Sequence, residues 1–339
     1  MRKLLLTGAA GFIGYHLAKR LLEEGYKLTG IDDLNGYYSP QLKKDRLGQL
    51  IKNPNFEFIK IDFSDQSKTR SFFKKQSFDQ IIHLGAQAGV RYSLENPQAY
   101  IDANITGFFN ILEGCRCNNI GKMIYASSSS VYGNNNKLPF SENDHVKQPV
   151  NLYGASKIAN EAMAHSYSSL FGIQMIGLRF FTVYGPWGRP DMALYLFTKS
   201  ILNGEPIQVF NQGEHTRSFT YIEDIIEAMH QLIKITENRS AKFEKNEIFN
   251  IGGSNPVKLM HFIKIIENNL GLEANIEYLP LQRGDVKKTN SNNKKLESII
   301  SYSPQTNIET GIKNFIEWYK AVSYTHLRAH ETLRYRVCR

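Results

Sequence analysis

Two residues that could act together in proton transfer, Tyr153 and Lys157, stand four positions apart in the stretch 151–157, which reads NLYGASK. At this spacing on a helix, the phenol and the ammonium lie on the same face. A free phenol has a pKa near ~10 and is a weak base at neutral pH, but a fixed positive charge beside it favours the phenolate. The pair could therefore serve as a general base. Solvated surface pairs show the same spacing, so the neighbouring elements must decide between the two interpretations.

Four consecutive serines, Ser127–Ser130, follow the apolar stretch Lys122–Ala126, which we predict to be a strand. Hydroxyl groups at the carboxyl end of a strand can donate hydrogen bonds into a cleft. The alternative is a polar loop without chemical function.

Three glycines, Gly8, Gly11 and Gly14, separate the apolar stretch Lys3–Thr7 from an amphipathic helical stretch. A strand, a glycine turn and a helix in this order are typical of a dinucleotide site, in which the backbone approaches the pyrophosphate at the helix N-terminus. A second strand ends at Asp32, about 20 residues beyond the glycines, where an acid would bind the adenosine ribose. An acid there disfavours the extra phosphate of NADP, and the alternative is a plain βα turn with a surface aspartate.

Further strands are predicted at Phe56–Asp62 and Gln80–Leu84, each followed by a helical stretch. Strands that alternate with helices predict an α/β fold, a Rossmann-like doubly wound parallel sheet covered on both faces. We assign residues 1–180 to this cofactor domain. Residues 181–321 are expected to form mainly a smaller mixed α/β lobe for the substrate, with some segments returning to the first domain.

The chain has 339 residues and a formal net charge of +9, and no apolar run long enough to span a membrane. The three cysteines form no disulfide or metal-binding pattern, which fits a reducing cytoplasm. A modest basic excess fits a phosphate-bearing ligand or solvated lysines and is no evidence for nucleic acid.

The last segment, 322–339, departs from the pattern before it and reads VSYTHLRAHETLRYRVCR. It resembles the translation of a sequencing adaptor, and we interpret it as a non-native tail. Four arginines and one glutamate give it a charge of +3, so residues 1–321 carry +6.

Taken together, these motifs resemble those of the extended short-chain dehydrogenase/reductase family, specifically the nucleotide-sugar epimerases and dehydratases. The resemblance runs from about residue 1 to about residue 321 and includes the motif Arg217-x-Phe-Thr-Tyr-Ile-x-Asp. It implies that Ser128, Tyr153 and Lys157 are the catalytic set. Ser128 would hydrogen-bond the reacting oxygen, Tyr153 would be the base, and Lys157 would lower the pKa of Tyr153 and hold the nicotinamide ribose.

The resemblance also implies NAD as cofactor, a UDP-sugar as substrate, no metal and a homodimeric assembly. Cofactor contacts would come from Gly8, Gly11, Phe12, Ile13, Gly14, Asp32, Asn35, Asp62, Asn104 and Lys157. Substrate contacts would come from Arg91, Ser129, Thr182, Arg189, Arg217 and Arg283.

Two features indicate which reaction within the family to expect. Dehydratases and decarboxylases of the family commonly carry an acid just after the position of Ser128, whereas this chain has Ser129 and Ser130 there. The stretch 178–192, with Arg189-Pro-Asp-Met, resembles the UDP-glucuronate 4-epimerase group, in which Arg189 would face the uronate carboxylate. We therefore expect interconversion of UDP-glucuronate and UDP-galacturonate through a 4-keto intermediate. Alternatives are a 4-epimerase of neutral UDP-hexoses, a UDP-glucuronate decarboxylase and a non-catalytic NAD-sensing protein.

Overall fold

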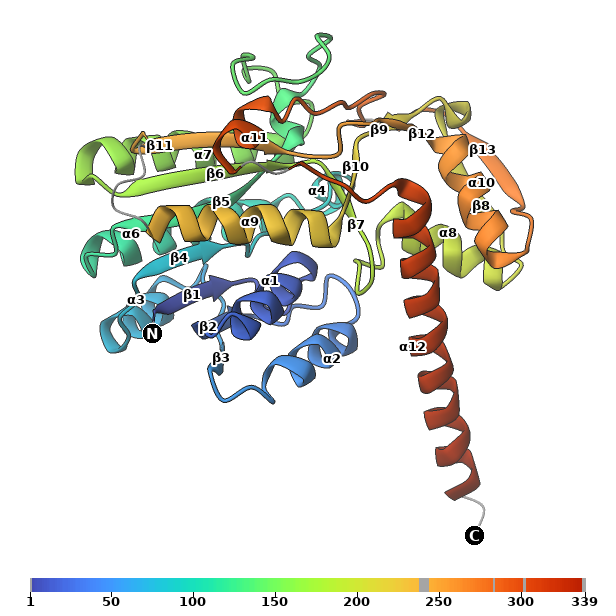
Figure 1. Cartoon of the computed structure of the whole chain (residues 1–339), viewed down its shortest axis with the longest axis horizontal. Coiled ribbons are helices and arrows are strands. Elements are labelled where there is room, and N and C mark those ends of the chain that lie inside the picture. The colour runs from blue at the N-terminus through green and yellow to red at the C-terminus, as the bar shows by residue number, and fades with distance from the viewer. Residues whose placement is uncertain (1, 238–243, 283, 301–302, 337–339) are drawn as a thin grey trace.

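Seven parallel strands form the central sheet of the computed structural model (Figure 1), which describes residues 2–237, 244–282, 284–300 and 303–336. Apolar side chains of these strands are buried on both faces, as a sheet covered by helices on both sides requires. The strands are β1 (Lys3–Thr7), β2 (Lys27–Asp32), β3 (Phe56–Lys60), β4 (Gln80–His83), β5 (Lys122–Ser128), β6 (Gln174–Phe180) and β11 (Asn246–Ile251).

The spatial order of the strands is β11-β6-β5-β4-β1-β2-β3, so the direction of winding reverses between β1 and β4. Thr7 of β1 pairs with His83 of β4 at this reversal. The connections that leave the carboxyl ends of β1 and β4 turn away from each other, which opens a crevice there. The predicted doubly wound parallel sheet is confirmed.

Helices cover both faces of the sheet (Figure 1), and those on one face pack against each other in the order α2, α1, α9 and α11. On the other face, α3 packs on α6 and α6 on α7, which begins just before Tyr153. The first group comprises α1 (Phe12–Glu23), α2 (Pro40–Leu50), α9 (Ile222–Glu237) and α11 (Lys294–Ile300); the second comprises α3 (Gln66–Lys75), α6 (Phe108–Cys117) and α7 (Leu152–Phe171).

Several short helical segments complete the secondary structure. They are α4 (Tyr92–Glu95), α5 (Gln98–Tyr100), the π-helical segment η1 (Ile101–Gly107), and the 3-10 turns η2 (Ser129–Tyr132) and η3 (Asn211–Gly213). Of these, η2 lies against the start of α7.

A smaller mixed lobe stands beside the crevice, on the right in Figure 1. In it, α10 packs against α8 and α12, and β8 pairs with β13 in parallel. Its elements, with the short strands that join it to the sheet, are β7 (Thr182–Tyr184), α8 (Ala193–Leu202), β8 (Ile207–Phe210), β9 (Thr216–Arg217), β10 (Phe219–Tyr221), β12 (Val257–Lys258), α10 (Leu259–Leu270), β13 (Ile276–Leu279) and α12 (Ile308–Arg336).

The chain returns from the smaller lobe to the larger one twice. The first return brings α9 onto α1 and β11 beside β6, and the second brings α11 against α9 and β11. The predicted division into residues 1–180 and 181–321, with segments of the second part returning to the first domain, stays a prediction. The segment 322–336 continues α12 as helix, and its interpretation as a tail also stays a prediction.

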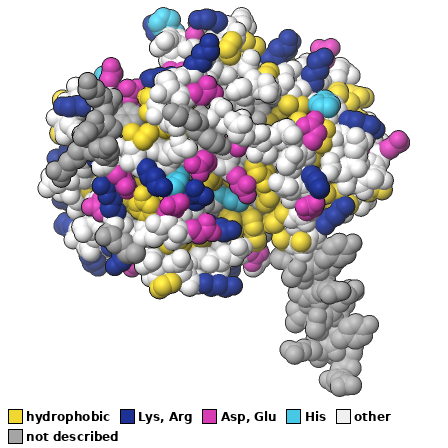
Figure 2. Space-filling model, in the orientation of Figure 1, with side chains coloured by type: hydrophobic (Ala, Val, Ile, Leu, Met, Phe, Trp, Pro, Cys, Tyr) yellow, Lys and Arg dark blue, Asp and Glu magenta, His cyan; other side chains and the backbone are white. Residues whose placement is uncertain are grey.

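Two properties of the surface bear on the expected partners. On the face in Figure 2, Lys and Arg side chains are interspersed with Asp and Glu side chains. Among the described helices, none has both the length and the apolar character needed to cross a bilayer.

Candidate active site

A large cleft lies at the carboxyl ends of the strands, where β1, β4 and β5 end and the smaller lobe closes over them. Most residues that the sequence singled out meet there, although they are spread over the whole chain. The predicted site residues that line the cleft are Gly8, Gly11, Phe12, Ile13, Gly14, Asp32, Asn35, Asp62, Ser128, Ser129, Tyr153, Lys157, Thr182, Arg189 and Arg217.

The glycine turn after β1 leaves no room for side chains at the start of α1. A Cβ atom on Gly14 would stand 2.1 Å from the carbonyl oxygen of Gly8, far inside van der Waals contact. Gly11 is the N-cap of α1, and no side-chain hydrogen bond caps this end. The amide groups of the first helical turn are thus left for an anion. This cradle fits the pyrophosphate of a dinucleotide.

Asp32 ends β2 beside the glycine turn and is buried. Its carboxylate accepts hydrogen bonds from the backbone N–H groups of Ala10 (3.2 Å) and Leu34 (2.9 Å). Burial raises the pKa of Asp32, and the nearby Lys43 ammonium acts in the opposite direction. The carboxylate is therefore held at the place where a ribose diol would need an acceptor.

Lys43 is a cleft residue that sequence reasoning missed. Its ammonium donates to the backbone oxygen (3.1 Å) and the side-chain oxygen (3.0 Å) of Asn35, and it lines the cleft beside Asp32. Nothing in the polar stretch 41–46 singles out this lysine, because its role depends on α2 turning it inward.

The N-terminus of α7 places Tyr153 against the serine turn. Asn151 caps the helix by accepting a hydrogen bond from the N–H of Gly154 (2.8 Å), which fixes the direction in which α7 starts. A Cβ atom on Gly154 would lie 2.6 Å from the carbonyl oxygen of Ser130. Glycine is thus required for the close approach of α7 to η2, which brings Tyr153 to Ser128.

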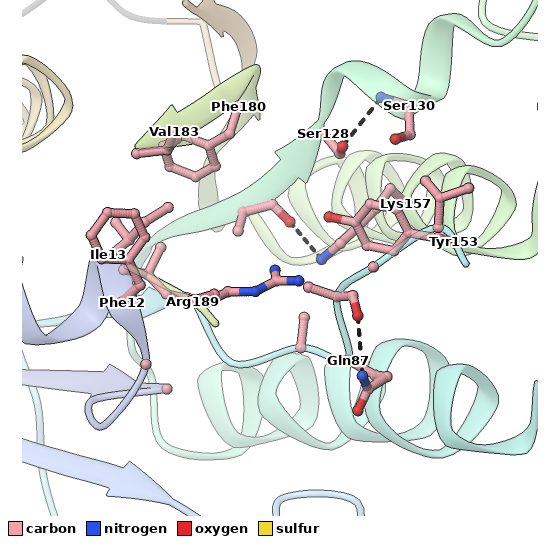
Figure 3. A pocket seen from close by; sticks show the side chains of 18 of the residues that line it. Phe12, Ile13, Gln87, Ser128, Ser130, Tyr153, Lys157, Phe180, Val183 and Arg189 are labelled. Atoms are coloured by element: carbon pink, nitrogen blue, oxygen red, sulfur yellow. Dashed lines mark hydrogen bonds between the residues drawn. The ribbon is translucent and has the colours of Figure 1, made fainter. Parts of the chain in front are cut away.

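Figure 3 shows Ser128, Tyr153, Lys157 and Arg189 converging on one space, with Phe12 and Ile13 closing one side. The Lys157 ammonium donates to the carbonyl oxygen of Ala126 (2.9 Å) and lies 6.0 Å from the centre of the Tyr153 ring. The two groups therefore lie on one face of α7, as predicted from their spacing.

Burial acts on both groups in the direction that disfavours charge. It raises the pKa of Tyr153, while a hydrogen bond with Ser128 and the charge of Arg189 lower it. Burial lowers the pKa of Lys157 to about 8, and the carboxylate of Glu161 opposes this change. The predicted lowering of the Tyr153 pKa by Lys157 stays a prediction for the ligand-bound protein.

A buried ion pair lies next to the predicted catalytic residues. Glu161, one turn after Lys157, binds Arg179 through two hydrogen bonds of 2.9 and 2.8 Å and accepts a third from Ser127 (2.6 Å). Arg179 also donates to the hydroxyl of Tyr132 at 2.9 Å. This network ties α7, the end of β5 and β6 together, so it holds the serine turn and the lysine in register.

Arg189 reaches the middle of the cleft from the loop after β7 (Figure 3). Asp191 accepts hydrogen bonds from its Nε (3.0 Å) and from one terminal nitrogen (2.5 Å), and Tyr37 donates to the same carboxylate at 2.9 Å. Neither hydrogen bond to Asp191 uses the other terminal nitrogen of Arg189, which could therefore face a ligand in the cleft.

A second cationic region lies where the smaller lobe meets the cleft. Arg217 lines it and binds Asp285 at 2.9 Å, and His215 lies 3.5 Å from the same carboxylate. The predicted partner Arg283 lies outside the described residues, whereas its neighbours Gly284 and Asp285 line the cleft.

Two predicted contact residues do not line the cleft itself. Asn104 is buried behind it and binds the backbone N–H and C=O of Gln87 (2.8 and 3.0 Å) and the hydroxyl of Ser156 (3.0 Å). Arg91 is exposed and stacks over the ring of Phe210 at 4.7 Å. In this structure Asn104 supports cleft residues and Arg91 stands outside the lining.

The described residues contain no group of three His, Cys, Asp or Glu side chains placed to hold a metal ion. The cleft places Tyr153, a phenol that could transfer a proton, beside a cradle for a dinucleotide and two arginines for anionic groups.

Residues 4–252 match the NAD dependent epimerase/dehydratase family, and the chain belongs to this family. Protein CapI from Staphylococcus aureus is 48% identical over 328 residues, which cover 94% of this chain and 98% of that protein. A probable UDP-glucuronate 4-epimerase from Rhizobium meliloti (strain 1021) is 41% identical over 341 residues, with 97% and 99% covered. The UDP-glucuronic acid 4-epimerase from Bacillus cereus, crystallised with UDP-glucuronic acid and NAD, superposes with a TM-score of 0.87 at 33% identity, with 94% and 99% covered.

The buried Lys157 gives a prediction on stability. Its pKa is about 8 in the folded protein and 10.5 in the unfolded chain, so the folded state binds fewer protons between these values. The free energy of unfolding therefore rises with pH from about 8 to about 10.5, and the destabilisation is fully present below pH 8. We expect Lys157→Met to be more stable than the wild type at pH 7, by up to about 3 kcal/mol.

Urea unfolding of both proteins at pH 7 and pH 10 measures this difference, which should shrink at the higher pH. Lys44→Met, on the exposed side of α2, controls for the loss of one positive charge. The assignment of Lys157 as a buried cation that destabilises the fold would be contradicted if Lys157→Met is not more stable than the wild type at pH 7. It would also be contradicted if the difference in the free energy of unfolding grows toward pH 10.

Proposed function

We propose that the protein is a cytoplasmic, NAD-dependent 4-epimerase that interconverts UDP-glucuronate and UDP-galacturonate. The observation that carries this proposal is the position of Arg189. Arg189 and Tyr153 line the same cleft, and Figure 3 shows the guanidinium facing the space into which the phenol also points. A sugar that reacts at carbon 4 and carries a carboxylate on carbon 5 matches these two groups.

The residues divide the work as follows. Ser128 and Tyr153 meet the 4-hydroxyl, and Tyr153 takes its proton when the sugar is oxidised and returns a proton when it is reduced. Lys157 holds the nicotinamide ribose and adds positive charge near the phenolate. Bound NAD supplies the acceptor and donor of a hydride at carbon 4. Arg217 neutralises charge on the diphosphate.

Inversion of the configuration at carbon 4 requires the 4-keto sugar to turn and present its other face to the nicotinamide while UDP stays bound. Arg217 lies in the smaller lobe, away from the catalytic set, so it can hold the diphosphate during this movement. The large cleft between the two lobes provides the space.

The 4-keto uronate is a β-keto acid and tends to lose carbon dioxide. We infer that Arg189 and Thr182 hold its carboxylate in an orientation unsuited to that loss. Consistent with this, the two residues that follow Ser128 and line the cleft are Ser129 and Ser130, neither of which is an acid. An acid there would be needed for proton transfer at carbon 5.

The direct test is to supply the purified protein with UDP-glucuronate alone and follow the products by NMR. UDP-galacturonate should appear and reach equilibrium without added reductant or oxidant. Accumulation of a UDP-pentose would replace the proposal with a decarboxylase. Conversion of UDP-glucose but not UDP-glucuronate would favour the neutral-sugar epimerase, and no conversion of either would favour an NAD-sensing protein.

Arg189→Ala tests the assignment of the acid sugar. Charged hydrogen bonds contribute about 1.5–3 kcal/mol, so we expect the affinity for UDP-glucuronate to fall by roughly 10- to 100-fold and that for UDP to stay unchanged. The matched control is Arg217→Ala, which should weaken both ligands alike. Calorimetric titration distinguishes these patterns, and equal losses for both ligands in Arg189→Ala would count against its role.

We also propose a homodimer. Ile101 and Phe109, eight residues apart along η1 and α6, are 40% and 38% exposed, and Ile105 stands between them at helical spacing. At the end of the neighbouring α7, Leu170 is 71% exposed. Such an apolar stripe fits a helical interface with a second copy. Sedimentation at the mass of a monomer would contradict this assignment.

A further inference from the structure

Arg46 is a fully buried arginine that lies outside the catalytic set described above. It is carried by α2, its relative exposure is 0%, and no carboxylate of the described residues forms an ion pair with it. A buried cation without a counter-ion is costly unless its donors are well used. Its hydrogen bonds therefore indicate what the residue does.

These hydrogen bonds join two segments that lie far apart in the sequence. One terminal nitrogen, Nη1, donates to the carbonyl oxygen of Ala10 (2.9 Å) in the glycine turn and to the hydroxyl of Tyr38 (2.8 Å). The other, Nη2, donates to the carbonyl oxygens of Trp187 (2.6 Å) and Gly188 (3.4 Å). The guanidinium thus spans from the cofactor cradle to the two residues that precede Arg189.

The segment that receives this contact has no strand or helix of its own to fix it. It connects β7, which ends at Tyr184, to α8, which begins at Ala193. Trp187 has a φ of +60°, a conformation that a non-glycine residue adopts only when its surroundings hold it there. The position of Arg189 in the cleft therefore depends on what binds the backbone just before it.

His16 of α1 makes a second connection of the same kind. Its Nε2 lies 2.9 Å from the carbonyl oxygen of Pro186, and burial lowers the pKa of His16 to about 4. The ring is neutral at pH 7, so Nε2 must carry the proton to donate to that oxygen. Tyr15, the preceding residue, places its ring 5.6 Å from that of Trp187.

We propose that Arg46, supported by His16, is a positioning residue that fixes Arg189 relative to the bound cofactor and so determines how the acid sugar is held. This inference rests on the proposed function for the identity of the sugar. A guanidinium suits the task because its planar fork reaches two segments at once, which the single ammonium of a lysine cannot do. UDP-glucuronate, which reaches Arg189, should depend on Arg46, whereas UDP alone should not.

The test uses Arg46→Lys, which keeps the charge and loses the fork. With NAD saturating, we expect the Kd for UDP-glucuronate to rise at least fivefold and the Kd for UDP to stay within twofold. NMR should show at least a fivefold higher ratio of UDP-pentose to UDP-galacturonate, because a displaced Arg189 no longer holds the carboxylate. A purely structural defect would lower the active fraction. It would change neither the ratio of the Kd for UDP-glucuronate to the Kd for UDP nor the ratio of UDP-pentose to UDP-galacturonate.

His16→Phe is the second variant, because it keeps an aromatic ring and loses the hydrogen-bond donor. If Arg46→Lys does not fold, this variant tests whether the contacts to the segment before Arg189 position that residue. It should change both ratios in the same direction, to a smaller extent. Arg20→Lys is the control and should match the wild type. Arg20 lies on α1 away from the cleft, and its side chain donates to Glu227 of α9 at 2.9 Å. Wild-type ratios in both Arg46→Lys and His16→Phe would overturn the proposal.

Failure of the proposed function gives a different result. A wild-type protein that does not form UDP-galacturonate would refute the function before any variant is compared. The affinities for UDP-glucuronate and UDP would still report whether Arg46 positions Arg189.

Discussion

Burial of two ionisable groups in the same cleft is the constraint on which the site depends. Removing Tyr153 and Lys157 from water favours the neutral phenol and the neutral amine, although the proposed chemistry needs a phenolate beside an ammonium. The surrounding residues must therefore stabilise the two charges in place of water. Ser128 and Arg189 act on the phenol, and Glu161 acts on the ammonium.

Those supporting groups are themselves held by the fold. Arg179 holds Glu161 in place through two hydrogen bonds, Asp191 orients Arg189, and the cap at Asn151 sets the start of α7. Each comes from a different element at the carboxyl edge of the sheet. The reversal of strand order brings these elements together, so the topology of the sheet also determines which charged groups surround the site.

Much of this could be predicted from the sequence, because the signals were local. The glycine turn, Asp32 and the Tyr153–Lys157 pair each follow from spacing within one element, and alternating strands and helices predict the parallel sheet. The structure places these residues around one cleft. The two lobes were also expected, although the pairing of β11 with β6 joins residues too far apart in sequence for periodicity to reveal.

Other parts could not be predicted, because they depend on which way a side chain turns. Lys43 and Arg46 lie in a charged stretch that resembles a solvated helix face, yet both point inward. Asp191 belongs to the Arg189-Pro-Asp-Met motif, but its ion pair with Arg189 depends on the conformation of the loop between β7 and α8. The hydrogen bonds of Asn104 with Gln87 and Ser156 likewise could not be predicted, and its predicted contact with the cofactor stays a prediction.

The central claim is that oxidation and reduction occur at carbon 4 within one closed site, with no proton transfer at carbon 5. Conversion of UDP-glucuronate in D2O, followed by NMR, tests it most directly. The UDP-galacturonate formed should keep protium at both carbon 4 and carbon 5. Deuterium at carbon 4 would show that the hydrogen exchanges with solvent, and deuterium at carbon 5 would show proton transfer there; either result would contradict the claim.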